Sequence, residues 1–236
     1  MKLARSNAVY IIAFLMWLAA YAYCHAEVCR VAVRLSVDNL HYRVLSPTVD
    51  QEHIRRGFEE FALLRERCST VAVHESAEDC TEFGNGLRKI DHLVPGELAA
   101  FDKVTDCKLP PVQGNQSAQP PSLDQLVTQT LSEQQDSDGE ASYWIADDLL
   151  ALLLVYPEEV ISNILAHPSF RERFISDLGG RAFEDLDDSP GSTHRVLREK
   201  MRVFAGLLAR LRRSDKDQAG RMKIISEMER ACRCTH

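Results

Sequence analysis

Two groups of side chains in this sequence could carry chemistry. The first is His74 with Glu75 and Asp79, an imidazole and two carboxylates that follow a short apolar segment. Such a group can supply a general base for hydrolysis, or nitrogen and oxygen ligands for a metal ion. No nucleophile motif such as G-x-S-x-G accompanies it, and acidic loops are common in an acidic chain. We therefore expect a solvated loop here more than a catalytic site.

The second group lies at the C-terminal end of the sequence. Cys232, Cys234 and His236 stand at alternate positions, so two thiolates and an imidazole could face one zinc or copper(I) ion. Structural metal sites usually combine two separated pairs of ligands with wider spacing. We therefore favour a disulfide that ties this end to the body, and we expect no metal and no cofactor.

Two adjacent carboxylates, Asp147 and Asp148, interrupt an otherwise apolar segment. Neighbouring residues on a helix point about 100° apart, so these two cannot act as one paired carboxylate site. We expect them in the first turn of a helix, where the helix dipole favours negative charge.

The C-terminal segment is basic, although the chain as a whole is acidic. Residues 192–236 carry 12 Lys and Arg against 5 Asp and Glu, whereas the whole chain has a net charge of −7. Overall acidity and the absence of interleaved aromatic residues argue against nucleic-acid binding. We expect a solvated helix face, or one docked on the acidic remainder of the chain. The arginines concerned are Arg195, Arg198, Arg202, Arg210, Arg212 and Arg213.

The first 26 residues have the layout of a secretory signal peptide. Lys2 and Arg5 precede an apolar run at residues 8–22, and small residues follow at Ala22 and Ala26. Cleavage after either alanine fits the pattern. The run of 15 residues is short against the roughly 20 needed to cross a bilayer, so an uncleaved membrane anchor is the lesser alternative. We expect a secreted protein, extracellular or, in a bacterium, periplasmic.

The cysteines favour cleavage after Ala26. That cleavage removes Cys24 and leaves an even number of cysteines, which an oxidising compartment would convert into a disulfide framework. We expect two bridges within residues 27–107, with the pairing left open. The six remaining cysteines are Cys29, Cys68, Cys80, Cys107, Cys232 and Cys234.

The pattern of residues 27–107 predicts a small domain that mixes strands and helices. Apolar residues alternate over residues 28–37 and again at 40–44, which is typical of a hairpin of half-buried strands. Thr48 and Gln51 predict a capping box at the start of a helix that runs to Arg67, followed by a third strand over residues 70–74. The expected fold class is therefore α+β, with an all-helical C-terminal part.

The rest of the chain divides into a linker and a helical domain. Prolines and polar residues at 108–121 begin a linker that extends to residue 141, with a short helix from Ser122 and a glycosylation sequon at Asn115. Residues 142–236 read as helices that start near Trp144, Pro157 and Pro168, followed by long amphipathic helices at 193–213 and 218–232.

No motif in the sequence indicates a named activity. We predict a secreted or periplasmic protein-binding module, comparable to inhibitors, immunity proteins or effectors, and favour a non-enzyme. The alternative is a secreted hydrolase or metal-dependent enzyme that uses the histidine and carboxylates of the N-terminal part. The expected partner is a protein and not a nucleic acid, and a membrane is contacted only through an uncleaved leader.

Overall fold

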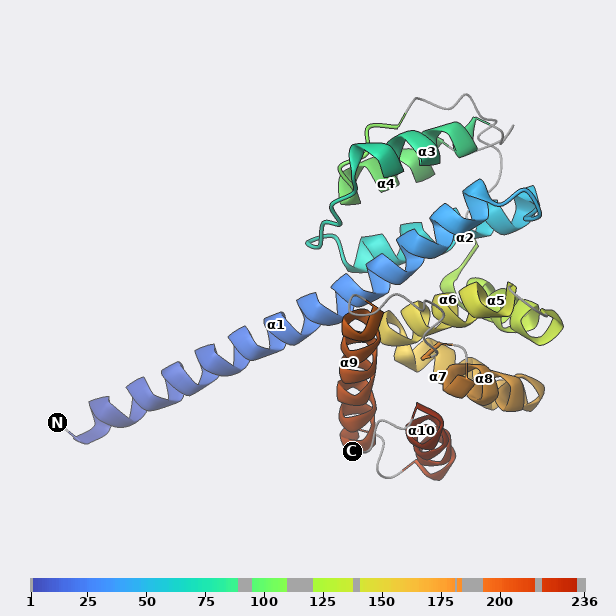
Figure 1. Cartoon of the computed structure of the whole chain (residues 1–236). Coiled ribbons are helices and arrows are strands. Elements are labelled where there is room, and N and C mark those ends of the chain that lie inside the picture. Colours follow the sequence, from blue (N-terminus) through green and yellow to red (C-terminus); the bar gives the residue numbers. More distant parts are fainter. Residues whose placement is uncertain are drawn as a thin grey trace.

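The computed structural model describes residues 2–88, 95–109, 121–137, 141–180, 182–183, 193–214 and 218–232. Over these residues the chain forms helices α1 to α10 and no strand (Figure 1). The fold is therefore all-helical, and the α+β architecture predicted for the N-terminal part is wrong.

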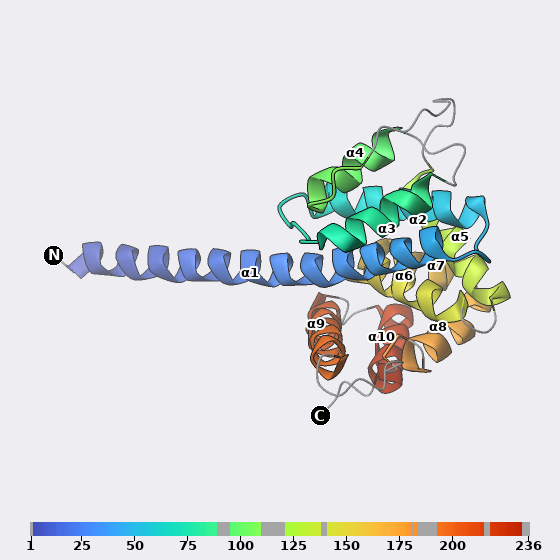
Figure 2. The ribbon, with the colours of Figure 1, turned by 45° about the horizontal axis from the view of Figure 1, so that its top comes forward.

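The largest correction concerns α1, a single helix from Lys2 to Leu45. Its N-terminal half extends away from the body and its C-terminal half runs through it (Figures 1 and 2). The predicted strand at residues 28–37 and the strand after it are both part of this helix. The alternating apolar residues wrongly predicted strands because this stretch of the helix is buried on several sides. The exposed residues of this stretch, Arg30, Arg34 and Asp38, recur every four positions, which is helical spacing.

Three helices cover one side of the inner half of α1 (Figure 1). They are α2 (Gln51–Arg67), α3 (Ala77–Leu87) and α4 (Pro95–Val104). Asp50, and not Thr48, caps α2, because its side chain accepts a hydrogen bond from the backbone N–H of His53. Aromatic side chains fill this layer, and the rings of Phe83 and Phe101 stack with centroids 4.5 Å apart.

The predicted third strand is also wrong. Residues 71–76 form an extended segment between α2 and α3 that pairs with no strand in the described residues. One backbone hydrogen bond of 2.6 Å, from the N–H of Val73 to the carbonyl of Val104, holds this segment against the end of α4.

The remaining six helices form the other layer of the body (Figure 2). α6 lies at its centre and is buried along most of its length, since it packs against α1, α5, α7 and α8. The predicted helices of residues 142–236 correspond closely to this layer. Its helices are α5 (Leu123–Asp136), α6 (Ala141–Val155), α7 (Pro157–Ala166), α8 (Pro168–Gly180), α9 (Thr193–Ser214) and α10 (Ala219–Cys232).

The inner half of α1 separates two apolar cores and contributes to both. Val31 and Leu35 belong to the core around α6, whereas Val33 and Leu40 belong to the aromatic core with α2, α3 and α4. The sequon residue Asn115 lies outside the described residues.

Within the described part of the chain, none of the helices alone has both the length and the apolar composition to span a membrane. Taken together, Ser142–Val155 and Pro157–Ala166 meet that test as a pair bent by 117°.

Candidate functional site

The three N-terminal candidates do not converge on one site. His74 and Glu75 lie in the extended segment before α3, and Asp79 lies in the first turn of α3. The His74 side chain is 81% exposed and its Nδ1 is 2.6 Å from Oδ2 of Asp106. This hydrogen bond raises the pKa of His74. The arrangement is an exposed His–Asp pair on the surface.

The two carboxylates have separate partners. Glu75 points inward, with Oε1 3.4 Å from Nη1 of Arg34, and burial raises its pKa. Asp79 forms a capping box with Ser76, and the hydrogen bonds from Ser76 lower the pKa of Asp79. Each of the three groups therefore has its own partner, and the imidazole and the two carboxylates are not bonded to one another.

Sequence reasoning missed Asp106 as the partner of His74. The two residues are 32 positions apart, and nothing near either of them indicates the pairing. They meet because Val73 is hydrogen-bonded to Val104 and because the disulfide between Cys80 and Cys107 holds α3 beside the end of α4.

The C-terminal candidates divide between the described and undescribed parts of the chain. Cys232 ends α10, is buried, and is disulfide-bonded. Cys234 and His236 lie outside the described residues. The described residues contain no group of three His, Cys, Asp or Glu side chains that could hold a metal ion.

Two disulfides tie the N-terminal layer together, which confirms the prediction of two bridges within residues 27–107. Cys29 of α1 is bonded to Cys68 at the end of α2, and Cys80 of α3 to Cys107 after α4. Cys24, on the projecting half of α1, is free and exposed. Such bridges favour an oxidising compartment.

A buried ionic cluster joins four helices at the centre of the body. Arg43 of α1 pairs with Asp148 of α6 and, at 3.4 Å, with Glu60 of α2, and all three side chains are at most 3% exposed. Thr130 of α5 donates a 2.6 Å hydrogen bond to Glu60. The guanidinium also lies 4.5 Å from the centre of the Trp144 ring, a cation–π contact. The ionic cluster holds the two layers in register.

The expectation for Asp147 and Asp148 is corrected in part. Neither lies in the first turn of α6, which begins at Ala141. They do point to different partners, as expected: Asp147 accepts from Lys200 of α9 at 2.8 Å, and Asp148 from Asn39 at 2.8 Å. Burial raises the pKa of Asp148 well above its ordinary range, and a hydrogen bond with Glu60 acts in the same direction.

A groove of about 340 Å³ lies between α1, the extended segment and α9. We call it the α1–α9 groove. Val31, Leu35 and Val73 are buried beneath it, and Val196 of α9, 49% exposed, forms a wall. A second cavity of about 440 Å³ lies where α1 enters the body, lined in part by His25, Val28 and Tyr156.

The two alternatives for the basic segment each describe part of it, since Lys200 and Arg202 of α9 contact acids in the remainder of the chain and other arginines of α9 are exposed. Lys200, Arg202 and Arg212 are paired with Asp147 of α6, Glu27 of α1 and Glu229 of α10. Other arginines of α9 face solvent. Residues spaced by three and four positions form one exposed line along α9, which we call the outer stripe. Its members are Arg195, Arg198, Arg202, Gly206, Ala209 and Arg213.

No protein-family model, no curated protein and no solved structure matches this chain.

Proposed function

We propose that this is a secreted protein-binding module and that it binds an acidic partner protein through the outer stripe of α9. One observation carries the proposal. Gly206 and Ala209, two residues with little or no side chain, lie at the middle of an exposed helix face that carries arginines. Small residues let another backbone approach closely, and the arginines beside them can bind carboxylates.

Gly206 is not explained by packing within the chain. A glycine inside a helix costs about 1 kcal/mol relative to alanine. A Cβ built at Gly206 would meet no atom within 4 Å, so the fold itself does not require the missing side chain. Close approach by a partner supplies a reason for it.

The charge of the outer stripe indicates the chemistry of the partner. Arg195 and Arg213 lie towards opposite ends of α9, and no acidic group in the described residues pairs with either. The chain otherwise carries an excess of acidic residues. An acidic protein surface is therefore the complementary partner, and charge complementarity of this kind mainly sets association rate and specificity.

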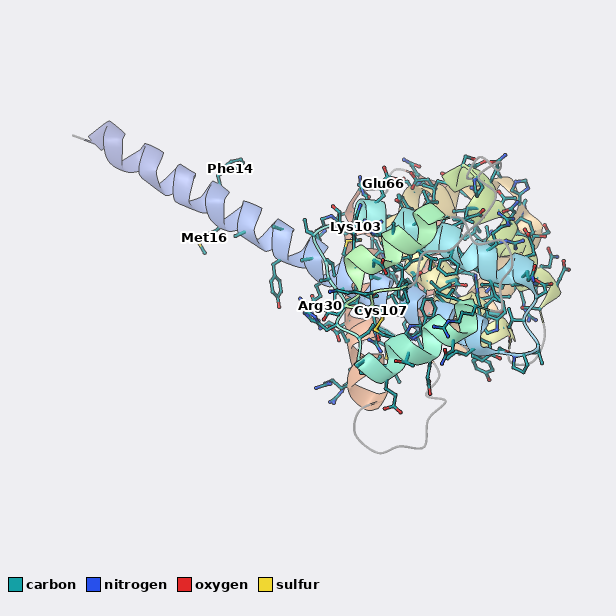
Figure 3. All side chains as sticks on the ribbon, turned by 90° about the horizontal axis from the view of Figure 1, so that it is seen from above. Phe14, Met16, Arg30, Glu66, Lys103 and Cys107 are labelled. Atoms are coloured by element: carbon teal, nitrogen blue, oxygen red, sulfur yellow. A yellow bond between two sulfur atoms is a disulfide. The ribbon has the colours of Figure 1, made fainter. Side chains whose placement is uncertain are left out.

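The projecting half of α1 supports secretion. Phe14, Met16 and Tyr23 are exposed there, and Figure 3 shows the first two on the projecting half of α1, clear of the body. From Ala26 onward the helix packs against the body. This boundary coincides with the cleavage site that leaves six cysteines, and cleavage there would remove the unpaired Cys24. We therefore place the mature N-terminus at Glu27, in the extracellular space or a periplasm.

The test is affinity capture from the secreted fraction with matched baits. We expect a partner that binds the natural protein and is lost with Arg195→Glu combined with Arg213→Glu, and also with Gly206→Trp. The control bait carries Lys103→Glu and Lys108→Glu, two exposed positions away from α9. Purified partner and protein should then bind with an affinity that falls as salt is added.

A partner captured equally by all baits would place the interaction elsewhere on the surface. A captured nucleic acid, with a steep salt dependence, would replace the protein partner by a polyanion. Mass spectrometry of the mature N-terminus provides a separate check, because an intact Met1 would contradict the cleavage.

The hydrolase alternative keeps one observation in its favour, the His74–Asp106 pair. A carboxylate bonded to Nδ1 orients an imidazole as a general base. If the protein is a hydrolase, His74→Ala abolishes its activity and leaves folding intact. If it is a binding module, His74→Ala leaves partner affinity unchanged.

A further inference from the structure

The α1–α9 groove has the size and lining of a small-molecule site, distinct from the outer stripe. Its volume of about 340 Å³ lies within the usual range for such sites, roughly 300–1,000 Å³. Two facing helices and the extended segment build it, so its walls come from three separate parts of the chain.

The floor of the groove is apolar. Val31 and Leu35 are each 6% exposed and Val73 is 7% exposed. Val196 of α9 adds an apolar wall. It is exposed, whereas most large apolar side chains of the body are buried. An apolar part of a ligand would therefore gain burial against four aliphatic side chains.

Most charges at the rim are already paired. Arg34 is shared between Asp38, at 2.9 Å, and Glu75, at 3.4 Å. Lys200 is bonded to Asp147 at 2.8 Å. His74 also lines the groove and is bonded to Asp106 at 2.6 Å. Glu199 on the α9 wall forms no ion pair with a described residue, and its charge raises the pKa of Arg202.

Arg30 differs from these rim residues. Its side chain is exposed at the point where α1 enters the body (Figure 3), and no described residue forms a hydrogen bond or ion pair with it. Glu27 is the nearby acid whose pKa Arg30 helps to lower, but its carboxylate accepts two hydrogen bonds from Arg202. The groove thus combines an apolar floor with one guanidinium that has no partner.

We propose that the α1–α9 groove binds a small amphipathic organic anion, whose apolar body lies on Val31, Leu35 and Val196 and whose single carboxylate or sulfonate is bound by Arg30. A guanidinium presents two parallel N–H donors that match the oxygens of such a group. This ligand site goes beyond the protein-binding function proposed above.

Naphthalene-1-sulfonate is a suitable probe, because it joins a flat apolar body to one sulfonate. It is titrated into the full chain labelled with 13C at the valine and leucine methyl groups. We expect saturable shifts at Val196 and Leu35, and none at Leu45, which is exposed outside the groove. Site-resolved methyl signals separate binding in the groove from any association with the projecting half of α1.

Two comparisons test the role of Arg30. Arg30→Gln should weaken sulfonate binding about tenfold or more, as expected for loss of a hydrogen bond to a charged group. Naphthalene-1-sulfonamide, the uncharged analogue, should bind weakly to the natural protein and to Arg30→Gln alike. Lys103→Gln serves as the matched control on α4 and should leave the affinity unchanged.

Equal affinity of the sulfonate for the natural protein and Arg30→Gln would overturn the proposal, as would absence of shifts at Val196 at millimolar probe. Val196→Trp, which fills the groove from an exposed position, should abolish binding while the unfolding transition stays in place. Arg195→Glu combined with Arg213→Glu should retain sulfonate binding, so this proposal and the proposed function can fail independently.

Discussion

Arg43 links three helices of the body through buried ion pairs. It is completely buried and neutralises carboxylates that come from two other helices. Breaking a buried ion pair from one side leaves an uncompensated buried charge, which costs more than the pair itself contributes. Replacing Arg43 alone should therefore destabilise the protein more than replacing Arg43 together with its acidic partners.

Arg43→Met should lower the free energy of unfolding by about 3–5 kcal/mol, measured by urea denaturation. Arg212→Met is the matched control, because it removes a half-exposed arginine that pairs with Glu229 at 3.1 Å, and should cost about 1 kcal/mol or less. Adding Asp148→Leu and Glu60→Met to Arg43→Met should recover part of the loss. Equal effects of the two single variants would contradict this account.

Asp148 should make stability depend on pH. Burial raises its pKa in the folded protein above the value in the unfolded chain. The folded state therefore holds the proton more tightly. The stabilisation is fully present below the unfolded pKa and is lost as pH rises through the folded pKa.

Asp148→Asn isolates this contribution, since an amide does not titrate. Unfolding free energies are measured for both proteins between mildly acidic and mildly basic pH. The stability of the natural protein relative to Asp148→Asn should fall as pH rises. A difference that stays constant with pH would contradict a shifted pKa. The comparison cancels other carboxyls, such as Asp50 and Glu227, whose lowered pKa values act in the opposite direction.

At the scale of elements, two glycines inside helices have opposite roles. A Cβ at Gly86 of α3 would lie 2.9 Å from the carbonyl oxygen of Val44, closer than real side chains approach backbone. α3 can pack on the end of α1 because this position has no side chain. Gly206 of α9 meets no such neighbour.

Replacing each of these two glycines by alanine should change the free energy of unfolding in opposite directions. Gly206→Ala should raise the free energy of unfolding by about 0.5–1 kcal/mol, since alanine is the better helix former. Gly86→Ala should lower it, because α3 must shift away from α1. Thermal unfolding of the two variants measures both effects, and a destabilised Gly206→Ala would indicate an internal contact at that position.

The elements that could be predicted from sequence are those with one buried face. α9 shows apolar residues such as Phe204, Leu208 and Leu211 at helical spacing, and its predicted end differs from the observed one by a single residue. The inner half of α1 lies between two cores, so apolar residues occur on several faces and the helical period is hidden. The sequence does not indicate α3, because Gly84 and Gly86 are typical of a turn. The packing of α3 onto α1 explains the second glycine.

The features of the candidate site also differ in whether the sequence predicts them. The two N-terminal disulfides could be expected from cysteine number and distribution. The His74–Asp106 pair and the ionic cluster around Arg43 could not, because each joins residues from separate helices or loops. Their partners are fixed by how the helices dock, which no local spacing encodes.

At the scale of the whole molecule, two disulfides cross-link the layer that α1 forms with α2, α3 and α4. The bridge between Cys29 and Cys68 spans 39 residues, and that between Cys80 and Cys107 spans 27. Closing loops of this length stabilises a fold by about 2–4 kcal/mol per bridge, mainly by restricting the unfolded chain.

Replacing Cys29 and Cys68 together by serine should therefore lower the free energy of unfolding by about 2–4 kcal/mol. Both variants are made in the full chain that retains residues 1–26, where Cys24→Ser is the control and should have no effect, since Cys24 is free and exposed. Denaturant unfolding under non-reducing conditions measures both. Unchanged stability of the double variant would show that helix packing alone holds α1 to α2.

The place of α1 between the two cores has a consequence for synthesis. α1 is synthesised before α6, so the side of α1 that carries Val31 and Leu35 lacks most of its core until α6 has been made, ending at Val155. At roughly 5–20 residues per second, that wait lasts on the order of ten seconds. By then the chain through Cys107 is complete, so both disulfides can close before the second core exists if the chain enters its oxidising compartment during synthesis. The body should therefore assemble from its N-terminal end, with the nascent α1 surface open to chaperones in the interval.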